Sequence, residues 1–345
     1  METKSSEING NIMNKLSKLC LAMAVGSSCA ISANALALNI VLTNDDSWET
    51  TNIQLLKSAL EEAGHDVIMS APCTGQSGKG GAMSHYRPVS IDESQAGEQE
   101  FCVGDTDTSV AFKDYVEGTP VMAAIYGIDI AAKNVWGQDP DLVISGPNEG
   151  NNLGFMNNNS GTLGATMAAL SRGIPAIAIS AHHNTSSDAK QSQLVANVVV
   201  DIVAQLVASQ SSGAPLLPAY TGLNVNTPED MNNHLGYKFT DVGWNAGAEF
   251  AFSEDLSQQS TAVYYMMKRL MEEGMDSSEA QVEAVALLKD KKGLAFNMGD
   301  AGDTNQNSEG VAVNQGYITI STIDGNVQAA RGKVALVEQR LVGLE

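Results

Sequence analysis

The segment LNIVLTNDD, residues 38–46, indicates the fold class of this chain. Leu38–Thr43 is a run of apolar and β-branched residues with the length of a buried strand, and it ends directly on Asn44, Asp45 and Asp46. A helix is expected next, because apolar residues recur at steps of three and four: Ile53, Leu56, Leu60 and Ala63. Gly64 is suited to end that helix. The stretch therefore predicts a strand, a polar loop and a helix in succession.

The same alternation continues along the chain. Further short strands are expected at residues 67–69, 141–145 and 176–180. Thr119-Pro120 is typical of a helix start, since threonine caps helices and proline is tolerated at the first helical position. Residues 161–172 predict another helix. Because strands that alternate with helices pair in parallel, we expect residues 38–183 to form a doubly wound, mostly parallel α/β sheet.

The chain is less regular after residue 183. Helices are expected at residues 187–209, 260–273 and 277–290, a loop at 298–309 and a strand at 316–321. Asp276 and Glu279 have the spacing of a capping box before the third of these helices. The sequence contains no internal repeat and no low-complexity linker.

The first 37 residues are interpreted as a secretory signal peptide. Lys15 and Lys18 form a basic start, Leu19–Ile31 is an apolar run, and Ala35-Leu36-Ala37 has the pattern of a cleavage site. A membrane anchor is the alternative, but the apolar run is shorter than the ~20 residues that a span needs. No later stretch is expected to be long and apolar enough to cross a bilayer. The sequence thus predicts a secreted or periplasmic protein whose mature chain begins at Leu38.

The composition excludes several classes of protein. Apolar residues make up 43% of the 345 residues, which is normal for a globular chain. Lys and Arg number 19 against 40 Asp and Glu, a formal charge of -21, so a broad basic surface for nucleic acid is excluded. Four Cys are too few for a disulfide scaffold. Only Cys73 and Cys102 remain after the leader, and they could form a disulfide or stay free thiols.

Polar loops follow three of the predicted strands. Ligands bind open α/β sheets at the carboxyl ends of the strands, where this chain places Asn44-Asp45-Asp46, loop 74–81 and loop 146–152. Asp45 and Asp46, with the Ser77 hydroxyl and the Asn148 carbonyl, make an all-oxygen ligand set that suits Mg²⁺, Mn²⁺ or Ca²⁺ rather than Zn²⁺. A lone Asp-Asp pair is commonly a solvated turn. Its position at the end of a strand favours the metal site.

A candidate anion site lies at the start of the helix predicted over residues 161–172. Exposed N–H groups and the positive helix end could hold a phosphate, with Ser160 and Thr162 adding hydroxyl donors. An ordinary helix cap is the alternative. A metal facing this helix end would supply the positive charge that such an acidic chain needs to bind an anion.

Several other motifs are incomplete. Loop 75–81 is not a Walker A motif, because Cys73 stands where the first Gly should be. No Gly-x-Gly-x-x-Gly follows the first strand, and no Gly-x-Ser-x-Gly indicates a serine hydrolase. His182-His183 is a poor metal pair because adjacent side chains point in different directions, and His85 has only a weak claim as a general acid. Residues 303–314 depart from a calcium loop at its Gly and Glu positions.

Taken in order, these motifs resemble the SurE family of survival proteins, which are metal-dependent nucleotidases and acid phosphatases. The resemblance is carried by TNDD (43–46), QSG (76–78), GTP (118–120), PDLVISG-x-N-x-G-x-N-x-G (140–154), SGT (160–162), GIPAIA (173–178) and GY (316–317). It is dense from residue 38 to about residue 181 and thin from 182 to 310. The segments GTPVM (118–122) and YGID (126–129) are similar to the secreted acid phosphatases of the family.

The resemblance implies roles for particular positions. The family's ligands for one divalent cation per subunit, Mg²⁺ or Mn²⁺, correspond to Asp45, Asp46, Ser77 and Asn148. The positions that line its phosphate pocket correspond to Asn44, Gly78, Asn152, Ser160, Gly161 and Thr162. We add Lys79, from the glycine loop, as a further candidate phosphate ligand. Asp45 and Asp46 are the candidate catalytic pair, and either could act as base or nucleophile.

The resemblance also implies an architecture. Residues 38–183 correspond to a Rossmann-like core, and residues 184–345 to the remainder of the domain, with C-terminal elements that form homodimers or homotetramers. Two positions depart from the family pattern: Ser47 replaces a Gly that usually follows Asn-Asp-Asp, and Met122 replaces an Asp. The turn after Asp46 is therefore expected to differ slightly in shape.

The sequence predicts metal-assisted hydrolysis of a phosphomonoester, most simply by a 5′/3′-nucleotidase. A broad acid phosphatase and a polyphosphatase are alternatives of the same kind. A secreted protein that binds a nucleotide or phosphate without turnover is an alternative of another class, as is a metal with a structural role alone. The expected partner is a small phosphomonoester, with no nucleic acid as a stable partner and no membrane after the leader is removed.

Overall fold

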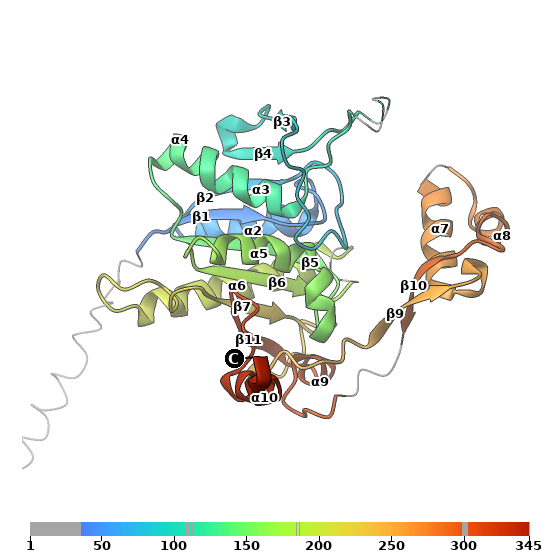
Figure 1. The fold of residues 1–345 in the computed structure, drawn as a ribbon. Helices are drawn as coiled ribbons and strands as arrows, with labels where there is room; N and C mark the ends of the chain where they lie inside the picture. The colour runs from blue at the N-terminus through green and yellow to red at the C-terminus, as the bar shows by residue number, and fades with distance from the viewer. Residues whose placement is uncertain are drawn as a thin grey trace, which may run out of the picture. The chain divides into compact units, whose positions relative to one another are not determined.

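The fold is built on one large sheet, which Figure 1 shows in a computed structural model. The structure describes residues 36–107, 109, 111, 114–183, 185, 187–272, 274–298 and 303–344. The predicted signal peptide lies outside the described residues except for its last two positions. The sheet has nine strands in the order β3-β4-β2-β1-β5-β6-β7-β11-β8.

Six neighbouring strands of this sheet run parallel, which confirms the predicted α/β class. They are β4 (Glu100–Val103), β2 (Asp66–Pro72), β1 (Asn39–Thr43), β5 (Leu142–Glu149), β6 (Ala176–Ala181) and β7 (Thr221–Asn226). β11 (Ile318–Asp324) is antiparallel to β7 and parallel to β8 (Tyr237–Thr240), and β3 (Ile91–Asp92) is antiparallel to β4. The strands after residue 183 thus continue the sheet that the earlier strands begin.

Helices cover both faces of the sheet, as expected of a doubly wound fold. On one face α2 (Thr51–Glu62) and α6 (Ala189–Ser209) pack over Ile40 and Leu42 of β1. On the other face α5 (Gly161–Leu170) and the helical run α3 (Pro120–Tyr126), η2 (Gly127–Ala131) and α4 (Ala132–Trp136) pack over Val41. This alternation of β1 side chains between two apolar cores follows from the two-residue period of a strand.

Two predicted helix starts are confirmed by their caps. The Thr119 hydroxyl accepts a hydrogen bond from the backbone N–H of Met122 at 3.2 Å, with Pro120 at the first helical position of α3. Asp276 accepts hydrogen bonds from the N–H groups of Ser278 (2.8 Å) and Glu279 (3.1 Å) at the start of α8 (Ser277–Leu288). Side-chain caps of this kind satisfy N–H groups that have no partner within the helix.

The prediction that no later stretch could span a membrane is wrong on length and composition. An 18-residue window within the 21-residue helix α6 has a mean hydropathy of 1.5, which is enough for a span. In this fold, however, α6 lies along α2 and buries Val195, Val199 and Val203 in the core. The long apolar stretch is accounted for by this buried face.

A second, two-stranded sheet was not predicted. β9 (Ala248–Ser253) pairs antiparallel with β10 (Gly293–Met298), and the chain between them forms η4 (Leu256–Gln258), α7 (Ser260–Glu272) and α8. These helices share a small core of their own around Leu270, Ala280 and Ala284. The remaining short elements are η1 (Ala96–Glu98), η3 (Gly154–Asn159), α9 (Glu309–Asn314), α10 (Arg331–Leu341) and η5 (Val342–Leu344).

The predicted loop over residues 298–309 agrees with the structure only in part. Met298 ends β10, and Glu309 begins α9. Residues 303–308 form turns, with an isolated bridge between Ser308 and Asp241, whereas residues 299–302 lie outside the described residues.

The loop predicted after the third strand is partly strand. β5 continues to Glu149, with its register shifted between Ser145 and Asn148, and the Gly146-Pro147 bond there is cis. Gly146 has φ +121°, and a methyl group on it would lie 2.1 Å from the Ile179 carbonyl oxygen. Only glycine fits this irregularity, which leads the strand directly to Asn148.

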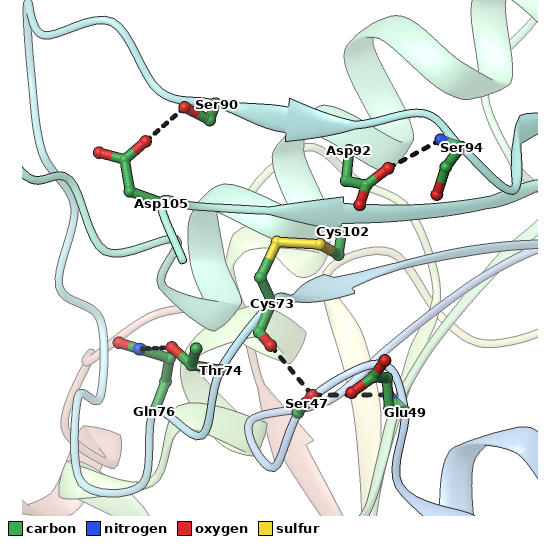
Figure 2. Close-up of a disulfide and its surroundings, with 10 residues drawn as sticks. All are labelled: Ser47, Glu49, Cys73, Thr74, Gln76, Ser90, Asp92, Ser94, Cys102 and Asp105. Atoms are coloured by element: carbon green, nitrogen blue, oxygen red, sulfur yellow. Dashed lines mark hydrogen bonds between the residues drawn. A yellow bond between two sulfur atoms is a disulfide. The ribbon is translucent and has the colours of Figure 1, made fainter. Parts of the chain in front are cut away.

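Cys73 and Cys102 form a disulfide, the first of the two alternatives that the sequence left open. Figure 2 shows the bond between the residue that follows β2 and a residue of β4. Cys73 also accepts a hydrogen bond from the Ser47 hydroxyl (3.2 Å) through its backbone oxygen. The disulfide thus stands beside the turn that follows Asp45 and Asp46.

Candidate active site

Three loops and one helix end meet around Asp45. The backbone oxygen of Asp45 accepts a hydrogen bond from Gln76 N (2.7 Å) in the glycine loop, and its Oδ1 accepts one from Thr162 Oγ1 (2.8 Å) at the start of α5. Asp46 Oδ2 accepts one from Glu149 N (2.8 Å) at the end of β5. The structure therefore brings together the polar segments that follow β1, β2 and β5, as expected of the carboxyl edge of a parallel sheet.

Burial keeps the two carboxyl groups from ionising easily. Asp45 is only 3% exposed, and burial raises its pKa to about 6. The pKa of Asp46 is raised well above its usual range, first by burial and then by the neighbouring charge of Asp45. No salt bridge to Lys or Arg involves either residue in the described part of the chain. A cation bound here would relieve both effects.

The other two candidate metal ligands differ in their surroundings. Asn148 is buried, and its Nδ2 donates to the Gly150 backbone oxygen, which leaves the amide oxygen as the atom suited to a cation. Ser77 is exposed in the glycine loop. The described residues include no group of three His, Cys, Asp or Glu side chains able to hold a metal. The predicted set does not depend on one, because it combines two carboxylates with an amide and a hydroxyl.

The start of α5 lies directly against Asp45. Ser160 is the N-cap, and its hydroxyl accepts a hydrogen bond from Leu163 N (3.2 Å). A methyl group on Gly161 would lie 2.8 Å from Asp45 Cβ, so only glycine allows this approach. The ordinary cap expected as an alternative is therefore present, and it stands beside a carboxylate pair. The N–H groups of this first turn and the positive helix end are the features that attract an anion.

Asn152 ties the helix start to the sheet. Its Nδ2 donates to Thr162 Oγ1 (3.2 Å) and to Ser180 Oγ (2.9 Å) of β6. Its backbone oxygen accepts from Asn224 Nδ2 (3.1 Å) and Asn226 Nδ2 (3.0 Å) of β7. Asn152 is buried, and its Nδ2 contact positions Thr162.

The glycine loop rests on α5. A methyl group on Gly164 would lie 2.1 Å from the Gly80 backbone oxygen, so the two chains touch along their backbones. Gly78 adopts φ +78°, which a side chain would disfavour. The ammonium of Lys79 forms an ion pair with Glu117, and its role as a phosphate ligand stays a prediction.

Asn44 shapes the turn that carries the two Asp residues. Its Nδ2 donates to the Ser47 backbone oxygen (2.8 Å) and to Thr50 Oγ1 (3.2 Å), and its Oδ1 accepts from Ser47 N (3.3 Å). Ser47 itself adopts φ +114°, in the region that favours glycine. The turn thus has a backbone conformation suited to the Gly of the family pattern, although Ser stands there.

Three histidines were considered as metal ligands or as a general acid. The rings of His182 and His183 lie with their centres 4.2 Å apart and are tilted by 41°. Burial, followed by the neighbouring His183, lowers the pKa of His182. His85 is exposed beside Tyr86.

A cavity of about 740 Å³ adjoins the helix start. Ser160 and Gly81 lie in its wall, together with the aromatic rings of Phe155 and Trp244 and with Asn157. The cavity was not predicted, because its wall combines segments more than 160 residues apart. It offers an apolar, aromatic surface beside the candidate anion site.

Sequence reasoning also missed a buried carboxylate. Glu309 is fully buried, and burial raises its pKa to about 7 although four hydrogen bonds favour its charged form. Two of its donors, Asn224 and Ser321, lie on β7 and β11. A signal was present in GLNVNT (222–227), where two Asn alternate with apolar residues along an otherwise buried strand.

Comparison with known proteins gives a consistent result. Residues 40–249 match the sequence profile of the family described as "Survival protein SurE". The chain is 32% identical over 213 residues to the "5′-nucleotidase SurE" of Stenotrophomonas maltophilia, covering 61% of this chain and 72% of that protein. It is 33% identical over 204 residues to the "Acid phosphatase" of Yarrowia lipolytica, covering 55% of this chain and 56% of that protein. The chain therefore spans just over half the length of this acid phosphatase.

A solved structure shares the fold. The crystal structure of the SurE protein from Aquifex aeolicus matches with a TM-score of 0.62 at 24% identity, covering 88% of this chain and 99% of that one. At this identity the match supports the arrangement of strands and helices described above.

Proposed function

The chain belongs to the SurE family. We propose that it is a metal-dependent phosphomonoester hydrolase, a 5′/3′-nucleotidase that releases phosphate from nucleoside monophosphates. The observation that carries the proposal is the close approach of the Asp45–Asp46 pair to the capped start of α5. A buried and a half-buried carboxyl group, with a helix end that attracts anions, suit a site that holds a cation and a phosphate together.

The residues present fit a hard divalent cation. Asp45, Asp46, Ser77 and Asn148 can each offer an oxygen atom. Asp45 is buried and Asp46 is half-buried, and no salt bridge pairs either carboxyl group with Lys or Arg among the described residues. These four residues would hold one Mg²⁺ or Mn²⁺ ion. When bound, such an ion polarises a phosphoryl oxygen and lowers the pKa of water, which assists hydrolysis.

The chain's own residues would bind and orient the phosphate. The first-turn N–H groups of α5, with the Ser160 hydroxyl, face the developing charge of the phosphoryl oxygens. Thr162 donates to Asp45 Oδ1 and so fixes which way that carboxylate points. Asn152 in turn fixes Thr162. One of the two Asp residues would act either as the base that takes a proton from the attacking water or as the nucleophile that attacks the phosphorus.

The cavity beside Ser160 supports a nucleoside as leaving group. Its 740 Å³ exceed what a phosphate needs, and Phe155 and Trp244 offer aromatic faces on which a base could stack. A broad acid phosphatase is the second candidate, favoured by the similarity to the acid phosphatase of Yarrowia lipolytica.

The test is phosphate release by the chain from Leu38, measured with Mg²⁺, Mn²⁺ or EDTA. We expect release from 5′- and 3′-nucleotides that EDTA abolishes and Mn²⁺ or Mg²⁺ restores. Faster release from p-nitrophenyl phosphate or polyphosphate than from nucleotides would favour the acid phosphatase or the polyphosphatase. Equal phosphate release in EDTA and in metal would contradict the metal site. If calorimetry detects nucleotide binding but no phosphate is released, the protein binds nucleotides without hydrolysing them.

The metal-free protein should become less stable as the pH rises from about 4 to about 7. In the folded protein the pKa of Asp45 is raised to about 6 and that of Glu309 to about 7. Each raised pKa stabilises the fold fully only below the pKa of the unfolded chain, where the group is protonated in both the folded and the unfolded state. This stabilisation is lost as the pH rises through the folded pKa. For Asp45 the loss is on the order of 3 kcal/mol. Mn²⁺ should restore stability at pH 7.5, where the carboxyl groups are ionised, and have little effect at pH 4.5.

Thermal unfolding at these two pH values, in EDTA and in Mn²⁺, measures this prediction. The matched control is a variant with Asp45→Asn and Asp46→Asn, in which the Mn²⁺ effect at pH 7.5 should vanish. Equal stabilisation by Mn²⁺ in this variant would mean that the ion binds elsewhere.

We also propose that the protein is exported and oligomeric. The Cys73–Cys102 disulfide supports an oxidising compartment, as the predicted signal peptide does. The exposed apolar side chains of α7, α8 and α10, among them Tyr265, Val282 and Leu336, support an interface between subunits in a homodimer or homotetramer.

A further inference from the structure

The strongest unexplained feature outside the candidate site is the buried carboxylate of Glu309. It opens the six-residue helix α9, and none of its surface is exposed. No salt bridge pairs it with Lys or Arg anywhere in the part of the chain that the structure describes. A buried carboxylate is costly, and an apolar side chain of similar size would pack at lower cost. Its presence therefore calls for a reason other than packing.

Four hydrogen bonds converge on this carboxylate from three parts of the fold. Oε1 accepts from Gly154 N and from Asn157 Nδ2, both at 3.1 Å, and these residues belong to η3. Oε2 accepts from Asn224 Nδ2 of β7 and from Ser321 Oγ of β11, both at 2.9 Å. With two bonds on each oxygen, the carboxylate is fully used as an acceptor.

Both oxygens connect to the candidate phosphate site by short routes. On the Oε1 side, η3 ends at Asn159, and the next residue is Ser160, the cap of α5. On the Oε2 side, the second N–H of the Asn224 amide donates to Asn152 O (3.1 Å), Asn152 donates to Thr162, and Thr162 donates to Asp45. Glu309 thus holds the segment before the helix start directly, and it reaches Asn152, which positions Thr162, through Asn224.

We propose that Glu309 is a positioning residue for phosphate binding: its carboxylate holds η3 and Asn224 so that the Ser160–Thr162 helix start keeps its place against Asp45. The inference rests on the proposed function only in naming phosphate as the ligand. Glu309 touches no substrate and takes part in no bond change. It acts through hydrogen bonds to a charged acceptor, which are about twice as strong as hydrogen bonds to a neutral one.

Glu309→Gln is the direct test. A glutamine keeps the shape and one acceptor oxygen, but it places an NH₂ group against two of the four donors. The Ser321 hydroxyl can turn to accept, whereas Gly154 N–H and the Asn224 amide, which also serves Asn152, cannot. We expect the affinity for inorganic phosphate, measured by calorimetry with Mn²⁺ present, to fall about tenfold, and KM for p-nitrophenyl phosphate to rise by a similar factor.

Ser70→Ala is the matched control for lost stability. It removes a buried hydrogen bond from β2 to the Ala123 backbone oxygen (2.7 Å), which has no connection to η3 or Asn224. We expect this variant to unfold at a lower temperature but to keep wild-type phosphate affinity and KM. If Glu309→Gln binds phosphate as tightly as Ser70→Ala does, Glu309 is merely structural and the inference is overturned.

A second pair of variants tests the same inference if Glu309→Gln does not fold. Asn157→Ala removes the side-chain link from Glu309 to η3, whereas Ser321→Ala removes the link from Glu309 to β11 together with the hydrogen bond between Ser321 and Thr240. Phosphate affinity should fall in the first and stay unchanged in the second, and equal affinities would contradict the inference. Since phosphate binding is measured without turnover, an inactive wild-type protein would contradict the proposed function and leave this comparison intact.

Discussion

Asp46→Asn should lower turnover at least a thousandfold while leaving the fold intact. The amide keeps an oxygen that can accept the hydrogen bond from Glu149 N, so the local backbone loses nothing. It removes one of the only two charged oxygen ligands in the predicted set, and with it the cation affinity and the base or nucleophile. In other active sites, removing a single electrostatic group lowers kcat by about two to three orders of magnitude. Asp46→Asn removes two roles together, a cation ligand and the candidate base or nucleophile.

The variant should also be at least as stable as the wild type in EDTA at pH 7.5. The pKa of Asp46 is raised by burial and by the charge of Asp45, so the ionised pair destabilises the metal-free fold. Phosphate release and thermal unfolding, measured on the same sample, check both parts. Lost activity with unchanged or raised stability is the pattern of a functional carboxylate.

Glu49→Gln is the matched control. Glu49 lies in the same turn, is exposed, and its backbone N–H donates to the Ser47 hydroxyl. Removing its charge changes the net charge by the same amount as Asp46→Asn but touches no candidate ligand. Wild-type turnover is expected. Comparable losses in the two variants would mean that the acidity of the turn as a whole matters, and the assignment of Asp46 would be wrong.

The part of the fold that follows β-α alternation could be predicted from the sequence. β1, β6 and the start of β5 (Leu142–Ile144) are mostly apolar and almost wholly buried, and such runs are recognisable without tertiary context. The polar residues that follow them were placed at one edge by the topology of parallel sheets alone. The contacts of Asp45 with Gln76 and Thr162 bear this out.

Elements that depend on distant partners could not be predicted. β7 contains two buried Asn residues whose amides hydrogen-bond Asn151, Asn152 and Glu309, so its pattern resembles a polar segment until those partners are known. β9 and β10 are short and pair across a long intervening segment, which no local periodicity reveals. Glu309 is the same case in the site: a Glu at a helix start is ordinary, and its burial is a property of the packed fold.

Gly161→Ala should be the most damaging single-methyl change at the site. The added carbon would lie 2.8 Å from Asp45 Cβ, 2.8 Å from Pro120 Cγ and 3.0 Å from Asp45 Oδ2. None of these atoms is the free end of a flexible chain: Pro120 is fixed in the first turn of α3, and Asp45 is held by Thr162 and Gln76. Either the carboxylate or the helix start must move away.

Such a shift should lower kcat/KM about a hundredfold or more, because small displacements of reacting groups are costly, and lower the free energy of unfolding by roughly 1–3 kcal/mol. Gly97→Ala is the control, since a methyl group there would meet no atom within 4 Å and Gly97 lies in η1, outside the candidate site. It should keep activity within about twofold, as surface substitutions usually do.

The stabilisation by Mn²⁺ decides which group moves in Gly161→Ala. If the Asp45 carboxylate is displaced, the stabilisation at pH 7.5 should shrink together with the activity, since the ion loses a ligand. If the helix start is displaced instead, Mn²⁺ should still stabilise the variant while its affinity for inorganic phosphate falls. Wild-type activity in Gly161→Ala would contradict both, because the contact between α5 and Asp45 would then be dispensable. At Gly161 the proposed cation ligand Asp45 and the proposed phosphate-binding start of α5 are thus in direct contact, so the two sites depend on the same residue.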